Sequence, residues 1–323
     1  MLEKYTKLFS RLRTDKGRDR YPAITNHRAP HKPFLLLSVM DLIAEGQITA
    51  NFIEPSFELL DTFNGYWFAV MPLGSKTSMA YPFPRLQTDG FWHLIPNPGH
   101  EIKYTDGFRS MNKLREICAG AKMDDDLFAL LLQPETREHL RMVLITYFAP
   151  EIRPSLIKQG RVNVIAYQYS LDLFKKVGAV EHPGEWLKGQ ESEVASTARN
   201  QGFRKAIVQL YDHRCALCGI RILTPEGHTI VEAAHIRPWN ESRDDRPTNG
   251  LSLCRLCHWS FDEGLMGVGD AYEVLVSKRV RTDQNMPGHM LAFAGRAIVR
   301  PDDQPFWPSQ DNLSDHRMRI FKN

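Results

Sequence analysis

Two pairs of cysteines are the residues whose spacing most directly implies chemistry. Cys215 and Cys218 form one C-x-x-C pair, and Cys254 and Cys257 form another. The thiolates of such a pair can turn toward one tetrahedral site, and two pairs supply four ligands. This pattern predicts a closed, structural Zn²⁺ site. Because protein ligands fill every position, we do not expect this zinc to be the catalytic ion.

Polar residues with reactive side chains lie between and after these cysteines, in the segments VEAAHIRPW and TNGLSLCRLCHWSFDEGL. With the cysteine pairs, they resemble the HNH endonucleases, in the subgroup whose two cysteine pairs bracket the catalytic hairpin. The defining residues of the family match His235, Asn249 and His258. The resemblance covers about residues 200–275. It implies a ββα-metal unit in which two strands carry the base and the asparagine, and a helix carries the metal ligands.

The resemblance assigns a role to each of these residues in the hydrolysis of a phosphodiester. His235 would be the general base, since a neutral imidazole accepts a proton near neutral pH. Asn249 would either orient that imidazole or tie the two strands together. His258 and Asp262 are spaced to share one helix face, where they can bind one divalent cation. We expect Mg²⁺ or Mn²⁺, with nickel or a second zinc as alternatives.

One position departs from the family pattern. Many HNH enzymes have Asp or His directly before the base as a further metal ligand, whereas this chain has Ala234. Glu232 is the nearest acid. Two roles remain open for it: it either reaches the metal or only supports His235.

Arginines around these residues are candidate contacts for DNA phosphates. We favour Arg237, which follows the base by two positions; solvent-facing charge is the alternative for each of them. The four arginines are Arg237, Arg243, Arg246 and Arg255.

The elements that must position these side chains suggest an α+β chain with more than one domain. A length of 323 residues is too long for one ordinary core. We predict a mixed N-terminal DNA-reading domain at 1–150, a connecting region at 151–197 and an HNH domain with a C-terminal extension at 198–323. Apolar spacing predicts helices over 1–13, 31–46, 55–68, 123–148 and 203–214, a strand over 91–95, and a strand followed by a helix over 162–177.

Two N-terminal segments, APHKPFLLLSVMDLI and AYPFPRLQTDGFWHL, resemble the sulfur-binding domain of McrA-like, modification-dependent restriction endonucleases. That domain recognises phosphorothioate DNA, in which sulfur replaces a non-bridging phosphate oxygen. The resemblance covers about residues 20–115. It implies an apolar cup for sulfur, a basic pair before the helix, and further DNA contacts. In this chain these are, in turn, Tyr81 and Pro82; His31 and Lys32; and Arg28, Arg85 and Arg109.

Charge and hydrophobicity agree with a protein that binds a polyanion. The net charge is only +3. Nine basic residues among residues 1–32, against Glu3, Asp15 and Asp19, nevertheless leave a local charge of +6; a solvated surface is the alternative. No stretch approaches the roughly 20 apolar residues that span a bilayer, and the first residues lack the apolar core of a signal peptide. We therefore expect a cytoplasmic protein without a membrane partner, in which the isolated Cys118 is a buried thiol.

The sequence thus predicts a type IV-like restriction endonuclease that binds phosphorothioate-modified double-stranded DNA and cuts nearby. One alternative keeps the nuclease and changes the mark, for example to methylated cytosine; Trp67, Phe91 and Trp92 would then be available to hold a flipped base. Another alternative is a zinc-stabilised DNA-binding protein without catalysis, which Ala234 favours. Because one HNH site nicks one strand, a double-strand break would require a homodimer or two independent events.

Overall fold

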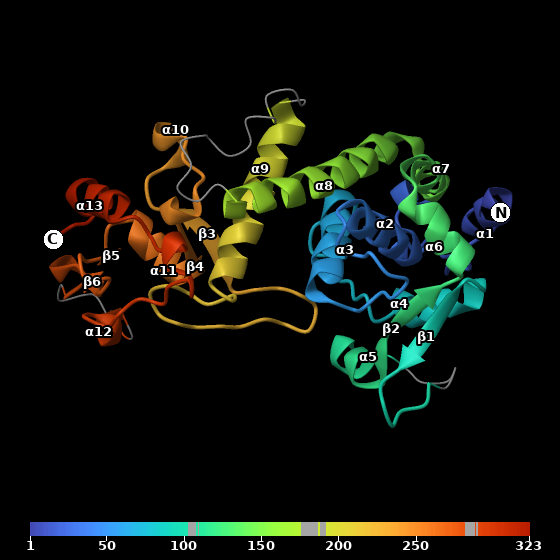
Figure 1. Cartoon of the computed structure of the whole chain (residues 1–323), viewed down its shortest axis with the longest axis horizontal. Coiled ribbons are helices and arrows are strands. Elements are labelled where there is room, and N and C mark those ends of the chain that lie inside the picture. The colour runs from blue at the N-terminus through green and yellow to red at the C-terminus, as the bar shows by residue number, and fades with distance from the viewer. Residues whose placement is uncertain (103–107, 109, 176–186, 188–191, 282–287, 289) are drawn as a thin grey trace. The chain divides into compact units, whose positions relative to one another are not determined.

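The computed structural model describes residues 1–102, 108, 110–175, 187, 192–281, 288 and 290–323. It divides the chain into two compact units (Figure 1). Unit 1 comprises Met1–Val164 and Pro225–His228, and unit 2 comprises Ile165–Thr224 and Thr229–Asn323. The first division falls inside a helix, within the region that the sequence suggested as a connection.

Unit 1 is built mainly of helices, with one antiparallel pair of strands. Its elements are α1 (Leu2–Phe9), η1 (Ala23–Thr25), α2 (His31–Ala44), α3 (Phe57–Val70), α4 (Pro82–Arg85), η2 (Leu86–Asp89), β1 (Trp92–Pro96), α5 (Met111–Ile117), β2 (Cys118–Met123), α6 (Asp125–Leu132), α7 (Pro134–Ile145), η3 (Pro150–Ile152) and the first half of α8 (Arg153–Lys175). In the sheet, Trp92 pairs with Met123 and Ile95 with Gly120. Cys118 begins β2 and is buried, as expected.

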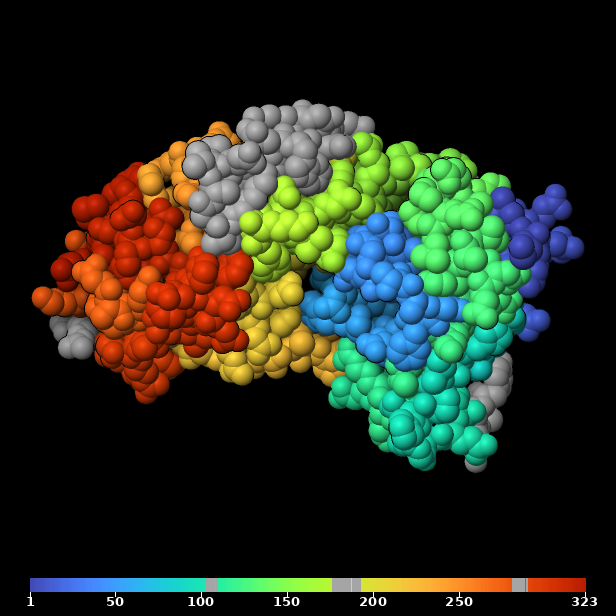
Figure 2. Space-filling model, viewed as in Figure 1, coloured from blue at the N-terminus to red at the C-terminus, as the bar shows by residue number. Residues whose placement is uncertain are grey.

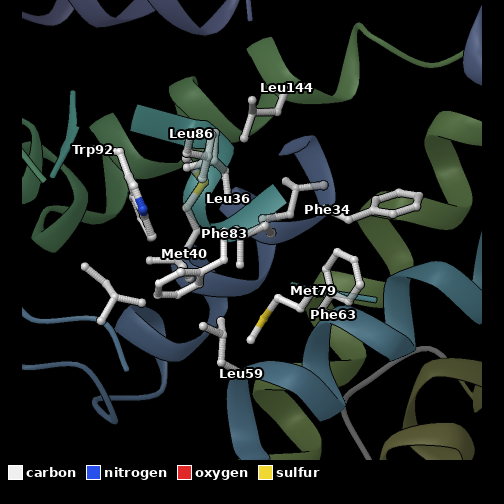
Figure 3. Packing of buried hydrophobic residues seen from close by; sticks show 14 of the residues in the cluster. Phe34, Leu36, Met40, Leu59, Phe63, Met79, Phe83, Leu86, Trp92 and Leu144 are labelled. Atoms are coloured by element: carbon white, nitrogen blue, oxygen red, sulfur yellow. The ribbon is translucent and has the colours of Figure 1, made fainter. Parts of the chain in front are cut away.

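The core of unit 1 surrounds α2, whose residues from Lys32 to Ile43 are all buried. A helix that is apolar on every side must be covered on every side. Figure 3 shows side chains of α2 and α3 converging with Phe83 of α4 and Trp92 of β1. In Figure 2 the blue surface of the α2–α3 region lies beside the green surface of later helices, in agreement with contacts between α2 and α7.

Two helical predictions were wrong in detail. The run over residues 123–148 forms two helices, α6 and α7, because Gln133 precedes a proline and is extended, with ψ 126°. The strand expected at the start of residues 162–177 is part of α8. Buried residues recur there every three or four positions, which is a helical repeat: Val162, Ile165, Ala166, Tyr169 and Leu173.

Unit 2 combines short helices with two antiparallel strand pairs, so the whole chain mixes helices and sheets as predicted. Its elements are the second half of α8, α9 (Ser192–Leu210), β3 (Val231–His235), α10 (Trp239–Ser242), η5 (Pro247–Asn249), β4 (Gly250–Cys254), α11 (Arg255–Asp262), β5 (Met266–Val268), β6 (Val274–Val276), η6 (Lys278–Arg281), α12 (Met290–Phe293), η7 (Gln304–Phe306) and α13 (Gln310–Arg319). Strand β3 pairs with β4, and β5 pairs with β6.

Close packing by α9 holds the β3–β4 hairpin. A Cβ atom at Gly250 would lie 2.3 Å from Cδ1 of Ile207 on α9, so a larger residue at the start of β4 would displace the Ile207 side chain. Helix α9 also approaches α8 closely, since a Cβ atom at Gly202 would lie 2.6 Å from the carbonyl oxygen of Ala166. These contacts fix the strand that carries His235.

No helix in the described part of the chain combines the length and apolar character needed to cross a membrane.

Candidate functional site

The β3–β4 hairpin and α11 form a strand–strand–helix unit around the predicted reactive residues. His235 ends β3 and pairs with Gly250, the first residue of β4. Asn249 directly precedes β4, and α11, which follows β4 without a break, carries His258 and Asp262. The structure therefore brings together on one small unit the residues that the sequence analysis selected.

The four predicted cysteines form one cluster, in which all four sulfur atoms lie within 4.8 Å of one another. The Sγ atoms of Cys218 and Cys254 are 3.8 Å apart. A tetrahedral zinc with bonds of about 2.3 Å requires sulfur atoms separated by about 3.8 Å. Cys215, Cys254 and Cys257 are buried, and Cys218 is half-buried. The cluster thus fits a closed zinc site.

The backbone around the first cysteine pair is shaped as a tight turn. The amide of Cys215 donates to the carbonyl oxygen of Ile220, and the amide of Gly219 donates to that of Cys215. Gly219 has φ +75°, a conformation that favours glycine. The amide of Ala216 also donates to Ser252 of β4, which ties this turn to the hairpin.

His235 is held on two sides. Its Nε2 atom lies 2.7 Å from Oδ1 of Asp245, and its ring stacks on Phe203 of α9 with centroids 4.0 Å apart. The side chain of His235 is 21% exposed, whereas that of Asp245 is 4% exposed. A half-buried imidazole with a fixed orientation suits a general base.

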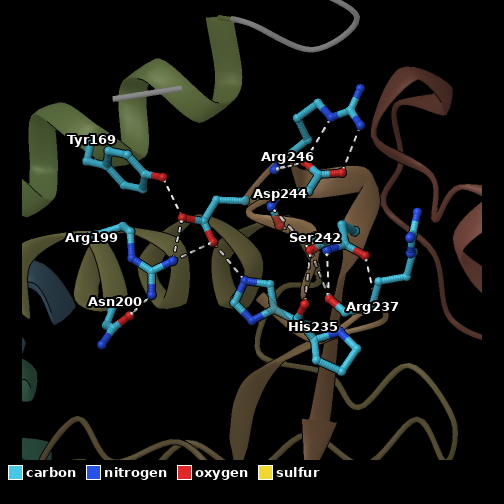
Figure 4. A network of polar contacts seen from close by, with 11 residues as sticks. Tyr169, Arg199, Asn200, His235, Arg237, Ser242, Asp244 and Arg246 are labelled. Atoms are coloured by element: carbon cyan, nitrogen blue, oxygen red, sulfur yellow. Dashed lines mark hydrogen bonds and ion pairs between the residues drawn. The ribbon is translucent and has the colours of Figure 1, made fainter. Parts of the chain in front are cut away.

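The sequence analysis missed Asp245 and the residues that bind it. The carboxylate accepts hydrogen bonds from the Tyr169 hydroxyl at 2.6 Å and the Arg199 guanidinium at 3.0 Å (Figure 4). Arg199 also stacks on Trp239, with its Cζ atom 3.6 Å from the ring centroid. Tyr169 and Arg199 lie far from the HNH segment in sequence, so its spacing gave no signal for them.

Asn249 ties the loop between the strands together. Its Oδ1 atom accepts from the amide of Arg237 at 2.9 Å, and its Nδ2 atom donates to the carbonyl oxygens of Arg237 and Asp244. Its side chain is completely buried. Of the two roles expected for Asn249, these contacts correspond to the structural one.

His258 lies between two carboxylates. Its Nδ1 atom is 3.5 Å from Glu232, and its Nε2 atom is 3.5 Å from Asp262. These side chains are open to solvent, with exposures of 27% for His258, 47% for Glu232 and 61% for Asp262. Because the carboxylates contact opposite ring nitrogens, a cation on one nitrogen would meet only one of them in this arrangement.

Glu232 contacts residues of α11. Residues three apart on a strand point to opposite faces. Glu232 accordingly contacts Arg255 and His258 of α11, whereas His235 stacks on α9. Glu232 shares its face with Ala234, two residues away. It is therefore on the face from which an acid at position 234 would project.

The four arginines around the hairpin differ in their partners. Arg237 lies 3.3 Å from Asp315, Arg246 forms a two-pronged pair with Asp244, and Arg255 lies 3.4 Å from Glu232. The guanidinium of Arg243 stacks on Trp239 at 4.1 Å. No carboxylate partner of Arg243 is found among the described residues.

Unit 1 brings most of the predicted reader residues into one pocket. The pocket has a volume of about 400 Å³. Its lining residues are Arg13, Thr14, Asp15, Tyr21, Ala29, His31, Lys32, Tyr81, Pro82 and Arg85. Tyr81 and Pro82 sit here because buried Phe83 anchors α4, with its ring edge-on to Trp92 at 5.3 Å. The Arg85 side chain lies over the Tyr81 ring.

The two residues of the predicted basic pair are not simple cations. Burial, and then the charge of Arg85, lower the pKa of His31 to about 4, so its ring is neutral at pH 7. The Lys32 amine lies 2.6 Å from Asp89, and both side chains are buried. Burial lowers the pKa of Lys32, while Asp89 opposes that change. Lys32 therefore has its charge matched inside the protein.

Arg28 is not among the residues that line this pocket. The backbone of Arg28 forms a bridge with Lys16, and its side chain is half-buried. Arg109 lies outside the residues that the structure describes.

Comparison with known proteins identifies the hairpin–helix unit. A family model described as HNH endonuclease matches residues 215–269. No curated protein matches the chain. A solved structure titled "Modification dependent TagI restriction endonuclease" is 24% identical, with a TM-score of 0.27; the match covers 36% of this chain and 37% of that chain. The match to the HNH family model does not depend on this structural similarity, which is weaker. Residues 215–269 are therefore an HNH endonuclease domain, the catalytic domain of a DNA endonuclease.

Proposed function

We propose that the protein is a modification-dependent endonuclease that cuts double-stranded DNA, with a nuclease domain at 198–323 and a DNA-reading domain at 1–150. The observation that carries this proposal is the arrangement of His235, Asn249 and His258 on one hairpin–helix unit that matches the HNH family model. The exposed cluster around His258 beside this hairpin supports catalysis rather than binding alone.

Zn²⁺ would be held by the four cysteines and would stabilise the fold of unit 2. A separate divalent cation, Mg²⁺ or Mn²⁺, would be held by His258 with Asp262; Glu232, which contacts the other ring nitrogen, would reach the same cation only after the His258 ring turns. When bound, that cation would neutralise charge on the phosphate.

The side chains of the chain would carry the remaining steps. His235 accepts a proton from water as the water oxygen bonds to phosphorus. The bond from phosphorus to the leaving oxygen breaks, and the leaving oxygen takes a proton from a second water molecule. Asn249 keeps the loop closed against the hairpin. Arg243 holds a neighbouring phosphate, a role that Arg237 fills less well because Asp315 pairs with it.

The DNA mark that fits the pocket of unit 1 best is a phosphorothioate. Sulfur is larger and less hydrated than oxygen, so apolar walls such as Tyr81 and Pro82 favour it. Neutral His31 adds to this character, while the Arg85 guanidinium provides charge for the phosphate. Lys32 would shape the pocket through Asp89 rather than contact DNA directly. Arg28 and Arg109 remain proposed contacts.

The alternative marks and the non-catalytic alternative receive less support. Trp67, Phe91 and Trp92, the aromatic residues considered for a flipped methylated cytosine, are each at most 4% exposed and belong to the core. A binding protein without catalysis is suggested only by Ala234, whereas Glu232 lies on the same strand face beside His258.

Cleavage tests the nuclease proposal directly. Plasmids with and without phosphorothioate would be incubated with the zinc-loaded full chain and Mn²⁺ or Mg²⁺, with His235→Ala as the inactive control. We expect cutting of modified plasmid by the wild type only. Equal cutting of both plasmids would overturn the modification dependence, and no cutting of any DNA with any divalent metal would overturn catalysis.

Binding tests the reader separately. Paired duplexes would differ by one phosphorothioate of either stereochemistry, and the protein would carry His235→Ala to prevent cutting. We expect tighter binding to one stereoisomer, and loss of that preference in Tyr81→Ala. Phe68→Ala is the matched control, because Phe68 is an exposed aromatic of unit 1 outside this pocket. A preference unchanged by Tyr81→Ala would exclude this pocket as the reader. The cutting rate, measured as a function of protein concentration, would show whether a homodimer cuts both strands.

A further inference from the structure

We infer that Asp245 is a positioning residue that holds His235 in one tautomer, with Nδ1 as the nitrogen that accepts the proton. This inference rests on the proposed role of His235 as the general base. It is carried by contacts in unit 2 that the family pattern, His235 with Asn249 and His258, does not include.

Two residues that donate hydrogen bonds surround Asp245. Its Oδ2 atom accepts from Tyr169 at 2.6 Å and from Arg199 at 3.0 Å. An arginine can only donate, and burial with the nearby Asp245 charge raises the pKa of Tyr169 far above its usual value, so this hydroxyl keeps its proton. Two donors therefore converge on this oxygen, and the Arg199 charge compensates a buried carboxylate.

The contact with Asp245 determines which ring nitrogen of His235 carries the hydrogen. The Oδ1 atom of Asp245 lies 2.7 Å from Nε2 of His235. A carboxylate only accepts hydrogen bonds, so Nε2 must carry the hydrogen. In the neutral ring the lone pair is then on Nδ1. No partner for Nδ1 occurs among the described residues, which leaves it available to water.

Stacking orients the His235 ring. Phe203 stacks on His235 with an angle of 4° between the ring planes. Figure 4 shows Tyr169, Arg199 and His235 directed at one carboxylate from different elements. The close approach of α8 and α9 at Gly202 brings Tyr169 and Arg199 together, since a Cβ atom there would lie 2.9 Å from the Tyr169 ring.

An ion pair between Asp245 and Arg199 that only stabilises the fold would show the same contacts. A test of the inference must therefore measure an effect of the His235 tautomer. In Asp245→Asn, the donors Tyr169 and Arg199 would orient the amide oxygen toward themselves. The amide nitrogen would then donate to Nε2 and force the hydrogen onto Nδ1, where it blocks the base. Asp245→Ala removes the contact without imposing this wrong tautomer.

Kinetics of the full-length, zinc-loaded protein on its modified substrate provide the first readout. We expect Asp245→Asn to lower kcat by roughly 10⁴-fold, the loss that a wrong histidine tautomer causes in a serine protease, with KM changed less than about twofold. Asp245→Ala should be less damaging than Asp245→Asn. The double variant Asp245→Asn/His235→Ala should cut no more slowly than His235→Ala. If Asp245→Asn slows both backgrounds equally, Asp245 does not act through His235.

The tautomer provides a readout that does not require cleavage. Long-range ¹H–¹⁵N correlation spectra of histidine-labelled protein, assigned with His235→Ala, should show hydrogen on Nε2 of His235 in the wild type and on Nδ1 in Asp245→Asn. Hydrogen on Nδ1 in the wild type would overturn the inference. If the wild type cuts no DNA, the proposed function fails, and these spectra still decide the inference.

Folding is controlled by two further variants. Asp245→Asn/Arg199→Met removes both charges together, which avoids an unpaired buried guanidinium; it should lose activity through the base even where it melts like the wild type. Tyr169→Phe removes one donor to Asp245 and keeps the contact with His235, so it should retain most of kcat and the Nε2–H tautomer. A loss in Tyr169→Phe as large as that in Asp245→Asn would contradict the inference.

Discussion

The cysteine cluster and the His258 cluster meet at α11 but differ in their access to solvent. Cys257 and His258 are neighbours on α11, yet Cys257 is 1% exposed and the side chain of His258 is 27% exposed. The cysteines lie close together in a closed set. The carboxylates around His258 are open and contact opposite ring nitrogens.

In the proposed function, α11 would serve two metals, one through Cys257 and one through His258. Buried thiolates that surround an ion leave no position for substrate, so their contribution is to folding. Exposed carboxylates and an imidazole leave room for phosphate and water. Four substitutions would test this difference between a folding role and a catalytic role.

The largest effect is expected from Cys215→Ser. Structural zinc supplies about 10–16 kcal/mol of binding free energy to small zinc domains, so loss of a ligand should unfold unit 2. Zinc content and thermal melting would measure this. Cys118→Ser is the matched control, because Cys118 is a buried thiol of unit 1 outside the cluster; it should retain zinc. A folded, zinc-containing Cys215→Ser protein would break the comparison.

His258→Ala should leave the fold intact and abolish most cutting. Loss of a ligand to the working cation should lower the cleavage rate by about 100-fold or more, while the cysteine cluster keeps its zinc. Trp259→Ala provides the control, since Trp259 is the next residue on α11 and is 56% exposed. Zinc loss in His258→Ala would show that the two clusters are one site.

Glu232→Gln tests whether Glu232 helps to bind the divalent cation or instead supports His235. We expect the Mn²⁺ concentration for half-maximal cutting to rise about tenfold, with a similar rate at saturating Mn²⁺. Glu263→Gln, which alters an exposed acid that follows α11, should not change this concentration. If the Mn²⁺ concentration for half-maximal cutting is unchanged and the maximal rate is lower, Glu232 supports His235 instead.

The smallest effect is expected from Arg243→Gln. Loss of one phosphate contact should reduce the slope of log Kobs against log salt concentration by about 1, without changing preference for the mark. Arg237→Gln should change this slope less, because Arg237 is paired with Asp315. The reverse order would favour the choice made from sequence.

Local spacing predicted the parts of the site that lie close together in the chain. The cysteine pairs and the shared helix face of His258 and Asp262 follow from short-range spacing, whereas the hairpin that ends at His235 was implied by the family resemblance. The family resemblance also indicated the group that meets in the pocket of unit 1. These features depend on turns and helical repeats, which a short segment encodes by itself.

Partners from distant segments could not be predicted in this way. Asp245 meets Tyr169 of α8 and Arg199 of α9, two helices that approach closely at Gly202. Lys32 and Asp89 are likewise distant in sequence, so Lys32 read as a free cation. Arg237 and Asp315 of α13 are also distant in sequence, so spacing gave no sign that Arg237 has an acidic partner.

The tetrapeptide Pro225–His228 has a consequence for dividing the protein. It belongs to unit 1, where the carbonyl oxygen of Glu226 accepts from Asn64 and that of Pro225 accepts from Arg115. In sequence it lies between the second zinc cysteine and β3. The chain therefore passes between the units after residues 164, 224 and 228. A nuclease fragment that begins after α8 would carry a loop without its packing partners, and a chimaera with another reader would need these four residues matched to the new domain.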